Sequence, residues 1–261
     1  MNQEYKEKGY FVVRGLFDKN ELVELKEVLL DFHESWKRKN SEFYSEKAVN
    51  SAYLTGSEHL SDARRDVLFQ FIGSHKVMKA LHSVVSERPS FMNTQLFFDP
   101  ANEGQNNYWH RDPQYHLTIE EQKEALSGPN VVHFRIPLAR ERGMELVPGT
   151  HKRWDTNEEL EIRLEKGSRR NHENLSTGVT VELDIGDLLV FSANMIHRGL
   201  YGMERLSLDI LFCDPEPDLM KFVDDDCLPN QEAIRKISDP SAFLNTIVLK
   251  ANNREMRATS A

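Results

Sequence analysis

The 261-residue chain has only two cysteines and no long apolar run. Cys213 and Cys227 form neither a disulfide framework nor a Cys-x-x-Cys unit, which favours a reducing compartment. No stretch approaches the roughly 20 apolar residues of a membrane span, and the first residues carry no apolar run of the signal-peptide type. We therefore expect a cytoplasmic protein that has no membrane partner.

Basic residues are also in deficit. Lys and Arg total 33 against 42 Asp and Glu, which gives a net charge of -9 and a pI of about 5.6. This sign is wrong for a protein that binds the phosphate backbone of nucleic acid, and it disfavours a dedicated site for the phosphates of an acyl-CoA. The hydrophobic fraction of 39% is ordinary for a globular protein. We expect a small-molecule partner and a monomer or homodimer.

The order of patterns along the chain predicts one domain over residues 1–261, with an N-terminal strand and helices in 1–90. A β-rich segment ends at Gly15, and Asp18 then occupies the position of a helix N-cap. Five apolar residues recur at intervals of three and four in the helix predicted next, and they should pack on the outside of a sheet. They are Leu22, Leu25, Leu29, Phe32 and Trp36. A second helical region is expected over 62–86.

From residue 91 to 213 the pattern changes to short β-rich runs separated by Gly, Pro and Asn. These runs cover residues 93–98, 131–138, 178–183, 188–192 and 205–212, and they predict a mainly β core with flanking helices. The stretch 154–178 is too polar for core, so it is either a solvated helix and loop or a mobile cover over a site. We assign residues 214–261 to peripheral packing.

A possible metal site begins at the triplet His110-Arg111-Asp112. In an extended chain, residues two apart point to the same side, so His110 and Asp112 could approach one metal. A surface histidine beside an Asp-Pro turn would fit the triplet equally well. His197 lies just past a buried strand, where many histidines are structural. Two imidazoles and one carboxylate on one side of a metal leave the opposite positions open, as in non-heme iron oxygenases.

A second feature lies on the final predicted strand, where Arg205, Ser207 and Asp209 share one face and apolar residues share the other. A buried guanidinium costs several kcal/mol unless an anion pairs with it, and its forked donors suit a carboxylate. This pattern predicts an anionic ligand at Arg205.

Several ordered motifs make the chain resemble the phytanoyl-CoA dioxygenase family. The motifs cover residues 9–17, 108–112, 144–152 and 184–197. The family consists of Fe(II)- and 2-oxoglutarate-dependent dioxygenases with a double-stranded β-helix, or jelly-roll, core. The turn at 142–150 and the short loop between His197 and Arg205 depart from the family pattern.

The resemblance implies that His110, Asp112 and His197 bind iron, and that Arg205, assisted by Ser207, binds the distal carboxylate of 2-oxoglutarate. The family also commonly uses an amide to contact this co-substrate. Two amides share one strand face here, Gln95, which we prefer, and Asn93. Related halogenases replace the metal carboxylate with a small residue, so Asp112 favours hydroxylation.

Substrate contacts are less defined by the sequence. His133 and Arg135 alternate with apolar residues on a predicted strand, so they face either solvent or a cavity where they could bind a substrate acid. Two aromatic residues either line the pocket or belong to the core: Trp109 and Phe97.

The reaction implied is hydroxylation of an unactivated C–H bond in a small polar metabolite. Oxygen and 2-oxoglutarate are consumed, and succinate and carbon dioxide are released. Three alternatives stay open. The first is a hydroxylase of the same family that acts on an acyl-CoA or a natural-product intermediate. The second is a catalytically silent ligand-binding barrel, and the third is a hydrolase or sensor that uses zinc at the same triad.

Overall fold

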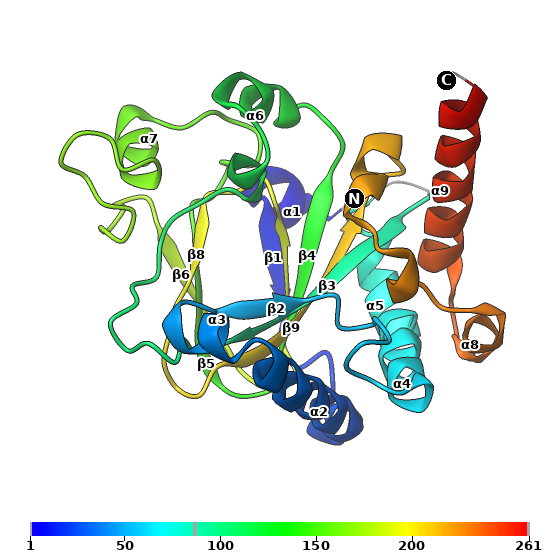
Figure 1. Ribbon diagram of the computed structural model, residues 1–261. Helices are drawn as coiled ribbons and strands as arrows, with labels where there is room; N and C mark the ends of the chain where they lie inside the picture. Colours follow the sequence, from blue (N-terminus) through cyan, green and yellow to red (C-terminus); the bar gives the residue numbers. More distant parts are fainter. Residues whose placement is uncertain (1, 86–87, 260–261) are drawn as a thin grey trace.

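The computed structural model describes residues 2–85 and 88–259, and its order of elements is drawn in Figure 1. The strands are β1 (Tyr10–Val13), β2 (Asn50–Ala52), β3 (Ser90–Phe98), β4 (Val131–Pro137), β5 (Glu141–Leu146), β6 (Val179–Leu183), β7 (Leu188–Ser192), β8 (His197–Gly199) and β9 (Leu206–Cys213). The α-helices are α1 (Gln3–Lys8), α2 (Val23–Lys39), α3 (Ser41–Glu46), α4 (Asp62–Ile72), α5 (His75–Leu81), α6 (Ile119–Ala125), α7 (Asn157–Arg163), α8 (Gln231–Lys236) and α9 (Ser241–Thr259). Four 3-10 helices complete the set: η1 (Lys19–Leu22), η2 (Asp112–Tyr115), η3 (Pro217–Phe222) and η4 (Asp225–Cys227).

The strands form two antiparallel sheets. The larger sheet has the order β1-β7-β4-β9-β3-β2, and the smaller has the order β6-β5-β8. Strands far apart in the sequence are neighbours, because β9 pairs with both β3 and β4. The predicted mainly β fold with flanking helices is confirmed. The sequence patterns did not predict strands β2, β5 and β8. Strands β2 and β8 have three residues each and are too short to show an alternation of side chains, and a register shift between Glu141 and Met144 interrupts β5.

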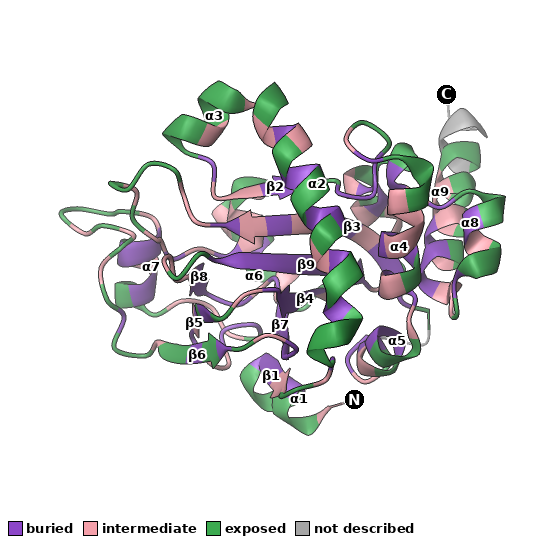
Figure 2. Cartoon of the chain, turned by 90° about the horizontal axis from the view of Figure 1, so that it is seen from below, coloured by how far each residue is buried: buried purple, intermediate pink, exposed green. Residues whose placement is uncertain are grey.

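Helices cover the outer face of the larger sheet. Asp18 caps η1 through a capping box with Glu21, and α2 follows directly. The apolar stripe of this helix is buried in one core cluster with side chains of β3, β4 and β9, which confirms the expected packing. Figure 2 shows α2 lying across the sheet with its buried residues turned toward it.

The predicted helical region 62–86 is divided into α4 and α5 at Gly73. A Cβ atom at this glycine would lie 2.1 Å from Ile237 Cγ2 and 2.8 Å from the carbonyl oxygen of Asp239, so only glycine fits without displacing the C-terminal segment. Residues after 214 are therefore packed against the N-terminal helices. In the described ranges, no helix combines the length and the apolar character that crossing a bilayer requires.

The charged stretch 154–178 is more deeply packed than its composition predicts. The side chain of Asp155 is fully buried and forms ion pairs of 2.7 Å with both Arg111 and Arg163. Arg163 is the last residue of α7, whose Ile162 joins an apolar cluster with Trp109. Most residues of this stretch are nevertheless exposed or half-buried, as expected for a solvated helix and loop, and the buried charges of Asp155 and Arg163 compensate one another.

Candidate active site

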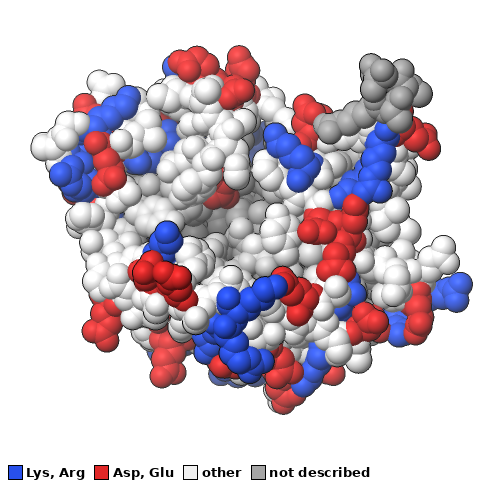
Figure 3. Space-filling model, viewed as in Figure 1, with Lys and Arg blue, Asp and Glu red and all other residues white. Residues whose placement is uncertain are grey.

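An apolar cluster of β1, β5, β6 and β7 side chains fills part of the space between the two sheets. Beside this cluster, residues of both sheets line a cavity of about 1030 Å³. Figure 3 shows a hollow at the centre of the molecular face, walled mainly by uncharged residues.

Two segments that are 87 residues apart carry the histidines of the predicted triad, and one β-bridge joins them. His110 and His197 exchange both backbone hydrogen bonds, at 3.0 and 2.9 Å. The Asp112 amide donates to the Ala193 carbonyl at 3.2 Å, which ties the end of the triplet to the segment after β7. The triplet is thus fixed between the end of β7 and the start of β8.

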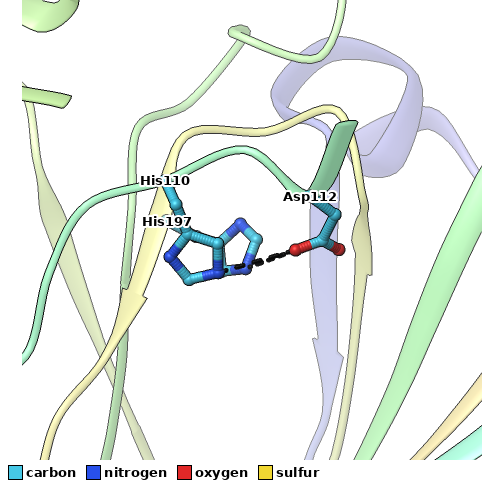
Figure 4. Close-up of side chains that lie close together, drawn as sticks. All are labelled: His110, Asp112 and His197. Atoms are coloured by element: carbon cyan, nitrogen blue, oxygen red, sulfur yellow. Dashed lines mark ion pairs between the residues drawn. The ribbon is translucent and has the colours of Figure 1, made fainter. Parts of the chain in front are cut away.

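The three side chains converge on one point (Figure 4), and their ligand atoms all lie within 4.8 Å of one another. Asp112 Oδ1 is 3.5 Å from His110 Nε2 and 3.6 Å from His197 Nε2. The Nδ1 atoms of the two rings lie 3.2 Å from the Tyr108 carbonyl and 3.0 Å from the Met195 carbonyl, respectively. If each Nδ1 donates to its carbonyl, each Nε2 keeps a free electron pair for a metal.

The electrostatics also suit a metal. Burial, together with the neighbouring His110, lowers the pKa of His197 to about 3, so this ring is neutral as a ligand must be. Burial would raise the pKa of Asp112, but His133 and His197 outweigh it and hold that pKa well below its usual range. The site therefore offers one carboxylate and two imidazoles to a cation.

Arg205 lines the same cavity. Its side chain is 2% exposed, and its Nε atom has no hydrogen-bond partner among the described residues. Glu141 Oε2 lies 3.8 Å from that nitrogen, which is too far for a hydrogen bond. Burial and the nearby Arg135 lower the pKa of Arg205 to about 10. This cavity-lining guanidinium could bind an anionic ligand.

Comparisons with known proteins identify the family of this chain. The family model for phytanoyl-CoA dioxygenase (PhyH) matches residues 5–200. The chain belongs to the phytanoyl-CoA dioxygenase family. Membership makes it an Fe(II)- and 2-oxoglutarate-dependent oxygenase, which confirms the expected enzyme class and cofactors. No curated protein matches the sequence.

Solved structures show the same fold at low sequence identity. EctD from S. alaskensis with 2-oxoglutarate and 5-hydroxyectoine is 14% identical, with a TM-score of 0.58 over 80% of this chain and 73% of that one. AviO1 from Streptomyces viridochromogenes Tue57 is 18% identical, with a TM-score of 0.57 over 82% and 93%. EctD from S. alaskensis with bound Fe is 13% identical, with a TM-score of 0.54 over 81% and 75%. The double-stranded β-helix expected for this family member is thereby confirmed.

The structure separates the other predicted residues into two groups. Gln95, Asn93 and Phe97 line the cavity from β3, as a co-substrate amide and a pocket aromatic should. Asn93 Oδ1 already accepts a hydrogen bond from the Thr94 amide at 2.7 Å. The preference for Gln95 over Asn93 is therefore retained as a prediction.

Three predicted residues have different surroundings from those expected: Ser207, Arg135 and Trp109. Ser207 donates to Glu141 Oε2 at 2.7 Å, and Arg135 is fully buried between Glu141 and Asp209. Neither Ser207 nor Arg135 is among the residues that line the cavity. His133 does line it, but both ring nitrogens face carboxylates.

Trp109 is fully buried, and its indole N–H donates to the Glu173 carbonyl at 2.9 Å. It belongs to the core cluster around Ile162 rather than to the cavity wall. We therefore correct the substrate role suggested for Trp109 and for Arg135, because their polar groups are already bound within the protein.

Sequence reasoning missed part of the cavity wall. Three tyrosines line it near the triad, Tyr108, Tyr115 and Tyr201, and the outer wall comes from α6 and η3. The η3 helix lies in the tail 214–261, so the assignment of the whole tail to peripheral packing is wrong for this segment. No residue of 154–178 lines the cavity, so the idea of a mobile cover in that stretch has no support from the described residues. The segments that form α6 and η3 show no sequence pattern beyond amphipathicity, so nothing in the sequence indicated that they would line a cavity.

Proposed function

We propose that His110, Asp112 and His197 bind the iron and that Arg205 binds the distal carboxylate of 2-oxoglutarate. The observation that carries this proposal is the presence of both groups in one cavity: three convergent ligand side chains and a buried guanidinium that lacks a full partner. A fork of N–H donors suits a carboxylate, and the buried site makes the pairing stronger than it would be in water.

The reaction proposed is hydroxylation of a C–H bond in a polar small molecule. Iron, with 2-oxoglutarate and oxygen, supplies the oxidation and releases succinate and carbon dioxide. The protein's residues hold the ligands and exclude water. The β-bridge and the carbonyl partners of the two imidazoles fix the ligand directions before metal binds, and Arg205 sets the orientation of the co-substrate.

The charges at the cavity wall favour a substrate without phosphates. Its side chains from α6, from η3 and from the N-cap of η3 include four carboxylates and one ammonium group: Glu121, Glu124, Glu216, Asp218 and Lys221. A phosphate-bearing chain such as an acyl-CoA would meet repulsion there. The cavity volume of about 1030 Å³ leaves room for a substrate larger than 2-oxoglutarate, which keeps a natural-product intermediate as the second candidate.

Succinate formation tests this proposal. Protein loaded with Fe(II) under anaerobic conditions is mixed with oxygen, 2-oxoglutarate and a panel of amines, acids, polyols and acyl-CoAs. We expect one uncharged or cationic polar compound to stimulate succinate release, and we expect His110→Ala and Arg205→Ala to abolish it. Stimulation by acyl-CoAs alone would refute the substrate class. Absence of both Fe(II) and 2-oxoglutarate binding would favour the silent barrel, and tight zinc binding without 2-oxoglutarate binding would favour a hydrolase or sensor.

A further inference from the structure

The two oxygens of the Asp112 carboxylate have different neighbours. Oδ1 faces the two histidine ligands, at 3.5 Å from His110 Nε2 and 3.6 Å from His197 Nε2. Oδ2 instead lies 2.6 Å from Nε2 of His133, a residue outside the triad. One oxygen therefore faces the point where the ligand atoms converge, and the other is held by the protein.

His133 is itself fixed on several sides. Its ring is stacked on Phe191, its partner in the register of β4 and β7, with 4.6 Å between centroids and 13° between planes. Its Nδ1 lies 3.3 Å from Asp209 Oδ2, and its side chain is 4% exposed. A rotation of this ring would break its contact with Asp112, with Asp209 or with both.

The contacts continue beyond Asp209 through the larger sheet to the co-substrate arginine. Asp209 Oδ1 accepts from Arg135 Nη1 at 3.1 Å, and these two residues are direct partners in the register of β4 and β9. Arg135 donates to both oxygens of Glu141, at 2.9 and 3.1 Å. Glu141 Oε2 lies 3.8 Å from Arg205 Nε. Acidic and basic groups alternate along this series, which we call the ion ladder: Asp112, His133, Asp209, Arg135, Glu141 and Arg205.

Stability alone does not account for the ion ladder. Well-packed apolar side chains of similar volume usually stabilise a core as well as buried ion pairs do, because removing charges from water is costly. The ion ladder also ends in the cavity at both sides, with Asp112 at the metal site and Arg205 at the co-substrate site. Its placement indicates a role in orienting these two groups.

We propose that His133 and Asp209 are positioning residues of the metal centre. They hold Oδ2 of Asp112 and thereby present Oδ1 to the metal, while the remainder of the ion ladder orients Arg205. This inference rests on the proposed assignment of Asp112 as a metal ligand. It gives His133 a role that differs from the substrate contact expected from the sequence.

A pair of substitutions at His133 separates positioning from packing. In His133→Gln the amide nitrogen can still donate to Asp112, whereas His133→Phe keeps the ring and its stacking on Phe191 but donates nothing. Metal-free full-length protein is titrated with Co(II), and the visible absorption bands of the bound ion give both the Kd and the ligand geometry. We expect His133→Gln to bind within about threefold of wild type. We expect the Kd of His133→Phe to rise roughly 10- to 100-fold, with altered Co(II) bands.

A second pair tests the next contact and controls for the loss of a buried carboxylate. Asp209→Asn removes the charge that faces His133. Asp187→Asn removes a buried carboxylate that pairs with Arg14, outside the ion ladder. We expect Asp209→Asn to weaken Co(II) binding about tenfold and Asp187→Asn to leave it within twofold. Equal affinities in these two variants, or wild-type affinity in His133→Phe, would overturn the positioning role.

One further variant distinguishes this failure from a failure of the proposed function. If wild type binds Co(II), His110→Ala does not, and His133→Phe matches wild type, only the positioning role is lost. If wild type does not bind Co(II), or if His110→Ala binds it equally well, the metal assignment fails and the positioning role fails with it.

Discussion

Replacing Arg205 with methionine should make the metal-free protein more stable and at the same time weaken its binding of 2-oxoglutarate. The guanidinium is buried, its Nε lacks a hydrogen bond, and Glu141 Oε2 is 3.8 Å away. Glu141 keeps two hydrogen bonds from Arg135 and one from Ser207 in the variant, so its charge stays compensated. Replacement of buried ion pairs by well-packed apolar side chains is often neutral or stabilising by about 1–4 kcal/mol, and we expect a change in this direction here because Glu141 keeps its other partners.

The cost in binding follows from the same burial. Loss of one partner from a desolvated charge pair costs about 3–5 kcal/mol. Since each 1.4 kcal/mol is a factor of ten, the Kd for 2-oxoglutarate should rise by at least about a hundredfold. Arg205→Lys should lie between wild type and Arg205→Met, because it keeps the charge and loses the fork.

Two assays measure these effects. Denaturant unfolding of metal-free protein gives the stability change, and calorimetry on Co(II)-loaded protein without oxygen gives the Kd. If Arg205→Met is less stable than wild type by more than about 1 kcal/mol, or if it binds 2-oxoglutarate within threefold of wild type, the guanidinium is a structural group and the reasoning is refuted.

Three further results are expected. In Gly199→Ala the new Cβ would lie 2.5 Å from Nη2 of Arg205, so calorimetry should show weaker 2-oxoglutarate binding with unchanged Co(II) binding; an unchanged Kd would contradict the close approach. Co(II) at a hundred times its Kd should raise the unfolding free energy by about 2.7 kcal/mol in wild type, and the rise should be absent in His197→Ala. Burial lowers the pKa of His151 to about 4 from 6.5, so the unfolded chain takes up this proton first as the pH falls. His151 therefore leaves the free energy of unfolding at its full value above pH 6.5 and lowers it toward pH 4, by up to about 3 kcal/mol. Unfolding measured across this range should show that loss in wild type but not in His151→Phe, and equal slopes would argue against it.

Local patterns were enough to predict two of the elements that bring the site together. The alternation of Arg205, Ser207 and Asp209 with leucines predicted a strand with a polar inner face, and β9 has that form. The helix after Asp18 was predicted from its cap and its apolar stripe. Both signals depend on neighbours in the sequence, which determine caps and periodicity.

These local patterns could not predict which side chains from distant strands contact one another. Whether a polar side chain on an inner strand face is free or paired depends on what the opposite strand places there. Arg135 was a reasonable candidate for binding a substrate acid, but its register partner is Asp209 and Glu141 meets it from β5. The wall formed by α6 and η3 was equally hidden, because a loop of the core and the C-terminal tail both contribute to it.

The carboxylate partners of other buried arginines can be compared with those of Arg205. Arg111 and Arg163 share the buried carboxylate of Asp155, and Arg135 is bound by Glu141 and Asp209, so each has a carboxylate within 3.1 Å. Arg205 differs from these three cations. Glu141 Oε2 lies 3.8 Å from its Nε and already accepts hydrogen bonds from Arg135 and Ser207. Because an uncompensated buried charge lowers stability, this exception is most simply explained by a ligand that supplies the missing carboxylate.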